Sequence, residues 1–185
     1  APAALSRGGS SLVRRLVGDA AVPQWTPDLP RGGRRREVLE HDGAELVWFS
    51  SCTQTMFGPA GPQEGGGVGD SFKRLCERAG VPLRTPEQLP SLCCGTPWKS
   101  KGLTQGYLQM QGEVISAVRQ ATEGGRLPLV CDASSCTEGL AVMLAEEGIT
   151  VVDAIAFTAE RILPVLREQR RASAGAGDDA SAAAV

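Results

Sequence analysis

The chain has 185 residues with a formal net charge of −2; 42% of them are hydrophobic and 4% aromatic. These numbers fit one domain with an aliphatic core. They do not favour nucleic-acid binding, because the one arginine run, Arg34-Arg35-Arg36, resembles a solvated linker. No apolar run approaches the roughly 18 residues that a membrane span needs, and the chain begins like the middle of a longer protein.

The predicted elements start with a helix and a linker over residues 1–45, where a short helix at 11–17 precedes prolines and paired glycines. An ordered domain follows over residues 46–170, and a tail over 171–185 lacks periodicity and is expected to be disordered. Within the domain the expected strands are 46–49, 81–83, 127–131 and 149–152. The expected helices are 71–79 after an Asp70 cap, 103–122, one capped by Ser134 or Ser135 and ending at 147, and 153–170.

Alternating strands and helices predict an α/β fold: a small parallel sheet with helices on both faces. Ligands in such sheets bind beyond the carboxyl ends of the strands. Cys52 follows the first strand, and Cys131 and Cys136 lie at and after the third. The loop that carries the adjacent pair Cys93-Cys94 can reach the same edge. The sequence therefore predicts a cluster of cysteines at that edge.

Four thiolates, from Cys52, Cys93, Cys94 and Cys136, are what a [4Fe–4S] cluster requires. Zinc also binds sulfur, but structural zinc sites usually take their ligands from pairs close together in sequence. Here about forty residues separate each group from the next. Such spacing needs a preformed fold, which favours a cluster in an oxidoreductase over structural zinc, although it does not exclude zinc.

Three sequence strings, residues 49–58, 93–102 and 132–140, resemble the cysteine-rich CCG domain family, and most closely its members among bacterial FAD-linked D-lactate dehydrogenases of the cytochrome type. The resemblance covers about residues 22–168. It implies an iron–sulfur electron-transfer domain cut from a flavin-linked D-lactate or other 2-hydroxy-acid dehydrogenase. It also implies FAD and a ferredoxin-like domain elsewhere in the parent protein, and a quinone or cytochrome as electron acceptor.

One position departs from the family pattern, which ends in Cys-x-x-Cys: the residue three before Cys136 is Ala133. This departure puts a five-cysteine cluster of the heterodisulfide-reductase type in doubt. Cys131 is a possible replacement ligand. Next to the ligands we expect Gly95, Trp98, Lys99, Lys101 and Ser135, where Gly95 allows backbone amides to approach sulfur. The two lysines could equally be solvated.

Other residues have simpler interpretations. Cys76 lies on the apolar face of its helix and is expected in the core. His41, the only histidine, is expected to be exposed and inactive. Asp132 is expected either to cap a helix or to accept hydrogen bonds near the cluster. Three other functions remain open: a structural or interaction module with a zinc or empty cysteine site, a heterodisulfide-reductase-like subunit, and thiol–disulfide chemistry at Cys131 and Cys136. The reducing environment that free thiols need predicts a cytoplasmic protein, with a peripheral position at the inner face of the membrane as the alternative.

Overall fold

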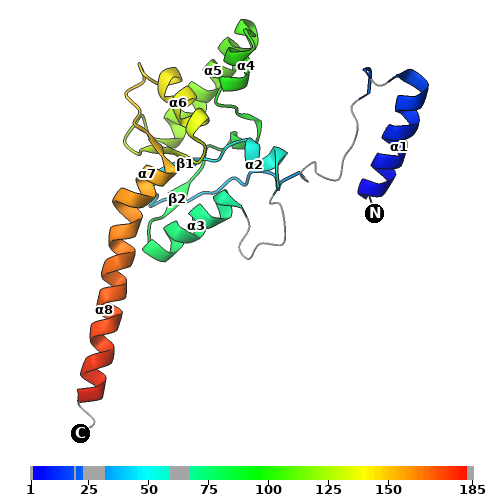
Figure 1. The fold of residues 1–185 in the computed structure, drawn as a ribbon. Coiled ribbons are helices and arrows are strands. Elements are labelled where there is room, and N and C mark those ends of the chain that lie inside the picture. Colours follow the sequence, from blue (N-terminus) through cyan, green and yellow to red (C-terminus); the bar gives the residue numbers. More distant parts are fainter. Residues whose placement is uncertain (1, 19, 23–31, 59–66, 183–185) are drawn as a thin grey trace.

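The computed structural model describes residues 2–18, 20–22, 32–58 and 67–182 (Figure 1). Within them, four strands form one parallel sheet in the order β2-β1-β3-β4. The strands are β1 (Leu46–Phe49), β2 (Leu83–Arg84), β3 (Leu129–Cys131) and β4 (Val151–Asp153). Because β1 connects to β2 on one side and pairs with β3 on the other, the strand order reverses between β1 and β3. Binding sites in open α/β sheets form at such a point.

Helices cover both faces of the sheet, as predicted. Side chains of β1 alternate, so that Val47 and Phe49 enter one core and Leu46 and Trp48 the other. The first core includes residues of α5 (Thr104–Ala121), α6 (Ser134–Met143) and η1 (Leu89–Ser91). The second includes residues of α3 (Val68–Ala79), α7 (Ala154–Phe157) and η2 (Thr158–Ile162). Short helices α2 (Thr53–Met56) and α4 (Thr96–Ser100) follow cysteine-bearing loops, and α1 (Pro2–Val17) replaces the shorter helix predicted at 11–17.

Several boundaries differ from the predictions. The predicted strand at 81–83 lies one to two residues later, helix α3 starts at Val68 and not after Asp70, and α6 ends at Met143 and not at 147. The N-cap residue of α6 is Ala133, so neither Ser134 nor Ser135 caps this helix. Local sequence places such ends poorly, because neighbouring contacts decide where a helix starts and stops.

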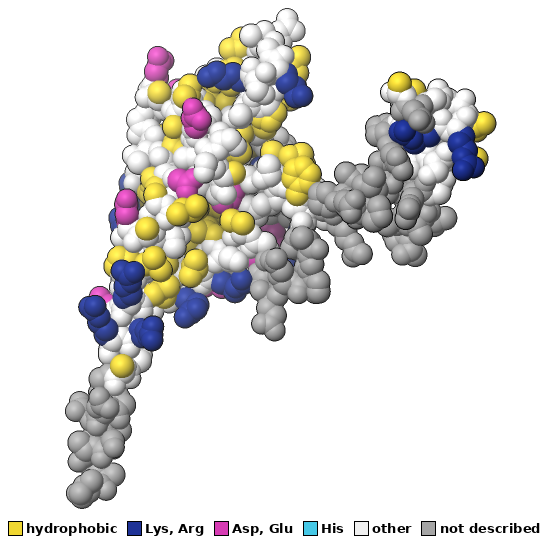
Figure 2. All heavy atoms as spheres, viewed as in Figure 1, with side chains coloured by type: hydrophobic (Ala, Val, Ile, Leu, Met, Phe, Trp, Pro, Cys, Tyr) yellow, Lys and Arg dark blue, Asp and Glu magenta, His cyan; other side chains and the backbone are white. Residues whose placement is uncertain are grey.

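The last helical stretch begins after the predicted Asp153 cap and runs through α7, the π-helical turn η2 and α8 (Leu163–Ala182). The π turn lies just before Pro164, whose ring crowds the preceding turn and which lacks a backbone N–H. Helix α8 extends beyond the sheet (Figure 1), and arginines 167, 170 and 171 in its first half are exposed. Figure 2 shows Lys and Arg side chains on this part of the helix. The helix includes residues 171–182, which the sequence analysis assigns to the tail.

The predicted linker divides into two parts. Residues 23–31, with all three prolines of the linker, lie outside the described residues, as do residues 59–66 between α2 and α3. Residues 32–45, in contrast, pack on the domain: the Gly33 amide donates to the Thr55 carbonyl (2.8 Å), and Glu37 pairs with Lys73 (2.9 Å). A Cβ atom at Gly33 would collide with the backbone of α2, so the segment lies directly on that helix. The domain therefore starts before residue 46.

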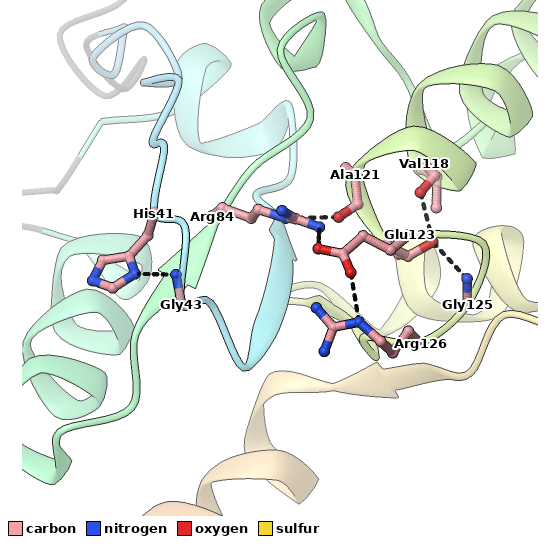
Figure 3. A network of polar contacts seen from close by, with 9 residues as sticks. His41, Gly43, Arg84, Val118, Ala121, Glu123, Gly125 and Arg126 are labelled. Carbon is pink, nitrogen blue, oxygen red and sulfur yellow. Dashed lines mark hydrogen bonds and ion pairs between the residues drawn. The ribbon is translucent and has the colours of Figure 1, made fainter.

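A polar network ties β2 to the loop that leads from α5 into the amino end of β3 (Figure 3). Arg84 donates to the Ala121 carbonyl (2.7 Å) and pairs with Glu123 (2.8 Å). The ion pairs of Glu123, first with Arg126 and then with Arg84, lower the pKa of its carboxyl group to about 2. His41 precedes β1 and accepts a hydrogen bond from the Gly43 amide (3.1 Å). It is exposed, as predicted, and lies before the amino end of β1, whereas the cysteines follow the carboxyl ends.

Replacing Asp153 with alanine is expected to reduce the free energy of unfolding by about 1 kcal/mol, measured by urea denaturation. Asp153 Oδ1 accepts the Ile155 amide at 2.9 Å and caps the helical stretch that packs on the second core. Asp153→Asn keeps an oxygen acceptor, so its free energy of unfolding should fall by less. Equal decreases in the free energy of unfolding of both variants would show that the cap contributes little.

Candidate metal centre

Five of the six cysteines lie at the carboxyl edge of the sheet, around the point where the strand order reverses. Cys52 is the N-cap residue of α2, just after β1, and Cys131 is the last residue of β3. Cys136 lies in the first turn of α6, and Cys93 and Cys94 lie on the loop between η1 and α4. The fold therefore brings together every cysteine that the sequence proposed as a ligand, including the replacement candidate Cys131.

The thiols form a continuous chain of contacts. Cys94 Sγ lies 3.2 Å from Cys136 Sγ. Cys94 also hydrogen bonds with Cys93, and Cys136 with Cys131. Cys52 is close enough to Cys93 for the two charges to interact. Three sequence segments, far apart along the chain, thus contribute sulfur to one group.

Backbone amides point at two of these sulfurs. Gly95 has φ +81°, a left-handed conformation that favours glycine, and its N–H donates to Cys93 while the Thr96 N–H donates to Cys94. A Cβ at Gly95 would lie 2.7 Å from the Met143 methyl carbon and 2.8 Å from the Tyr107 ring. This is the amide approach that the sequence predicts for Gly95. Such donors stabilise negative charge on sulfur.

The thiols do not ionise equally. Hydrogen bonds from Cys136 and Cys93 lower the pKa of the Cys94 thiol to about 2, against the opposing effect of burial. The hydrogen bond with Cys94 raises the pKa of Cys93. The hydrogen bonds with Cys131 and Cys94 raise the pKa of Cys136. Cys94 therefore ionises more readily than Cys93 and Cys136, whose thiols donate the hydrogen bonds that stabilise it.

The group is buried on one side and accessible on the other. Cys94, Cys131 and Cys136 are buried, while Cys52 and Cys93 are half-buried. The sulfur of Met110, on α5, accepts a hydrogen bond from the Cys93 amide (3.2 Å). Sequence analysis did not identify Met110, because a methionine on a helix face normally indicates only core packing.

Asp132 joins the segments that carry Cys52 and Cys131. Its Oδ1 accepts the Ser51 amide at 2.8 Å, and its Oδ2 accepts from Trp48 Nε1 at 3.1 Å and from Gln54 Nε2. Burial raises the pKa of this carboxyl group, whereas its hydrogen bonds oppose that rise. The prediction that Asp132 accepts hydrogen bonds near the cysteines is confirmed.

Arg36 contradicts its interpretation as a solvated linker residue. The side chain is half-buried and donates to the carbonyls of Ser50 (3.0 Å), Pro90 (3.2 Å) and Leu92 (2.6 Å). Nothing in the run Arg34-Arg35-Arg36 distinguished it from its two exposed neighbours. Only the path of residues 32–45 over the domain brings it to the cysteine loops.

A cavity of about 1070 Å³ opens on the other side of this edge, toward α3 and α7. Its walls are largely apolar and include Trp48, Phe72 and Ile155. Arg36, Ser50 and Asp132 also line it, so residues that contact the cysteine-bearing loops form part of its wall.

The remaining predicted neighbours lie less close to the sulfurs. Lys99 and Lys101 are exposed. Trp98 is half-buried, with its ring against Gly106 of α5, where a Cβ would lie 2.5 Å from it. The Ser135 carbonyl accepts a hydrogen bond from the Thr96 hydroxyl (3.1 Å), which joins the Cys94 loop to α6. Cys76 is 1% exposed in the second core, as predicted, and burial raises its pKa to about 12.

The chemistry of the five thiols limits which metals this site can bind. Among the described residues, no three cysteine, histidine, aspartate or glutamate side chains surround one point as ligands of a single ion do. The five gathered donors are all thiols, without the oxygen ligands that hard metals prefer. Soft sulfur donors suit zinc as well as the iron of an iron–sulfur cluster, in which each iron takes its own cysteine.

Comparison with protein-family models, with curated proteins and with solved structures gave no match. In the part of the chain that the structure describes, no helix has the length and apolarity needed to cross a membrane.

Proposed function

We propose that this domain holds an iron–sulfur cluster and transfers electrons. The observation that carries the proposal is the chain of sulfur contacts through Cys93, Cys94, Cys136 and Cys131, with Cys52 nearby. Cysteines are among the most buried residues, but an apolar core has no reason to gather five of them from three segments. A ligand bound by all of these cysteines would explain why they lie together.

A [4Fe–4S] cluster would be held by Cys52, Cys93, Cys94 and Cys136, with Cys131 as a fifth thiol at the position that Ala133 leaves without sulfur. Contact between Cys131 and Cys136 supports this role for Cys131. When bound, the cluster would supply one-electron transfer. The chain would position it, donate amides from Gly95 and Thr96, and keep water away from its buried side.

The resemblance of the sequence to CCG domains supports a more specific proposal. The domain would belong to a flavin-linked dehydrogenase of D-lactate or another 2-hydroxy acid, and would relay electrons from FAD, through a ferredoxin-like domain, toward a quinone or cytochrome. A place at the inner face of a membrane would suit either acceptor. The half-buried sulfurs of Cys52 and Cys93 support a relay, because an electron donor or acceptor can approach them.

The direct test is anaerobic reconstitution of the chain with ferrous iron and sulfide. We expect roughly four iron and four sulfide per chain, a brown colour bleached by dithionite, and a paramagnetic resonance signal in the reduced protein. A chain that stays colourless and instead binds one zinc would overturn the proposal.

One distance favours a second candidate, a redox-active dithiol. The sulfurs of Cys94 and Cys136 are 3.2 Å apart, and the low pKa of Cys94 supplies the thiolate that attacks a disulfide. Attack on an oxidised small-molecule disulfide would release one thiol, and Cys136 would then release the second, leaving a Cys94–Cys136 disulfide. The reconstitution test separates the two candidates, because a dithiol enzyme binds no iron. The pair Cys94 and Cys136 differs from the pair Cys131 and Cys136 that the sequence suggests for thiol–disulfide chemistry.

A further inference from the structure

We propose that Arg36 is a positioning residue for the cysteine site: it holds the Cys52 loop and the Cys93-Cys94 loop at a set separation and places a positive charge beside them. The part that concerns a bound cluster rests on the proposed function. The mechanical part concerns the metal-free chain and can be tested separately.

The contacts of Arg36 join two distant segments. Its guanidinium donates to the carbonyl of Ser50, which closely precedes Cys52, and to that of Leu92, which immediately precedes Cys93. A third bond reaches the Pro90 carbonyl in η1. A planar guanidinium presents several donors in a rigid fork, so one side chain can fix two loops, whereas the single ammonium of lysine cannot reproduce that geometry.

The charge of Arg36 acts on the same residues. Burial lowers the pKa of its guanidinium, while the electrostatic interaction with Cys52, Cys93, Asp132 and Cys136 opposes that effect. The guanidinium remains cationic in proteins. It therefore lies close to three of the proposed ligands as a permanent counter-charge for thiolates or for an anionic cluster.

The test compares Arg36→Gln and Arg36→Lys with Arg35→Gln, the matched control at an exposed neighbouring arginine. In the metal-free chain, a short bifunctional methanethiosulfonate should bridge the half-buried pair Cys52 and Cys93, and peptide mapping measures the bridged fraction. We expect bridging to be roughly tenfold slower in both Arg36 variants and unchanged in Arg35→Gln. Far-ultraviolet circular dichroism confirms that each variant is folded.

In the reconstituted chain, the midpoint potential of the cluster distinguishes the effect of the positive charge of Arg36 from the effect of its hydrogen bonds to the two loops. Arg36→Gln should shift the potential to more negative values, because removal of a nearby positive charge disfavours the reduced cluster, while Arg36→Lys should stay close to the unmodified chain. Unchanged bridging in folded Arg36→Gln would overturn the proposal. If the unmodified chain binds no cluster, the proposed function fails, yet the bridging experiment still decides whether Arg36 holds the loops.

Discussion

Replacing Cys94 with alanine is expected to lower the iron of the reconstituted chain from roughly four atoms to less than about one. Cys94 is the thiol with the most partners: it contacts Cys93 and Cys136 and receives the Thr96 amide. Its loss removes a ligand and also the thiolate around which its neighbours are arranged. Chemical analysis of iron and sulfide after anaerobic desalting measures the result.

Cys76→Ala is the matched control, because it removes a buried sulfur from the second core and leaves the five gathered thiols in place. We expect it to cost about 1 kcal/mol of stability through a small cavity while the iron content stays unchanged. Iron content in both Cys94→Ala and Cys94→Ala/Cys131→Ala that equals the iron content of Cys76→Ala would exclude Cys94 as a ligand. If Cys131 replaces the missing thiol, the double variant Cys94→Ala/Cys131→Ala would lose iron where Cys94→Ala does not.

Gly139→Ala is expected to destabilise the domain by about 1–3 kcal/mol and to reduce cluster loading in proportion to the displacement of the Cys94 loop. A Cβ at Gly139 would lie 2.4 Å from the Thr96 hydroxyl oxygen and 3.1 Å from the Cys94 carbonyl. Because Cys136 belongs to the same helix, α6, any shift of the loop separates Cys94 from Cys136. Urea denaturation and iron analysis of the same sample measure both effects.

Gly112→Ala is the same substitution as Gly139→Ala, but here we expect the domain to become more stable. Gly112 lies exposed within α5, and a Cβ there meets no atom within 4 Å. Alanine has the better helix propensity, so this variant should gain up to about 1 kcal/mol and keep its iron. Similar results for the two glycines would show that the contact between α6 and the Cys94 loop is not close.

The sequence alone determined the class of fold and the position of the cysteines in it. Short apolar runs such as Leu46–Phe49 indicate buried strands, and their alternation with helices permits little other than a parallel sheet. Once the strands are known, Cys52 and Cys131 must lie at the carboxyl edge. Gly95 could also be predicted, because a glycine after paired cysteines indicates a close backbone approach.

Only the tertiary structure decided which side chains surround the thiols. Arg36 resembles Arg34 and Arg35 in sequence, and its burial depends on how residues 32–45 lie across α2 and η1. The contact between Cys94 and Cys136 likewise depends on the packing of the loop before α4 against α6. The physical reason is that hydrophobic periodicity reports which face of an element is buried, whereas a hydrogen bond between segments depends on the distance to a partner that the local pattern does not encode.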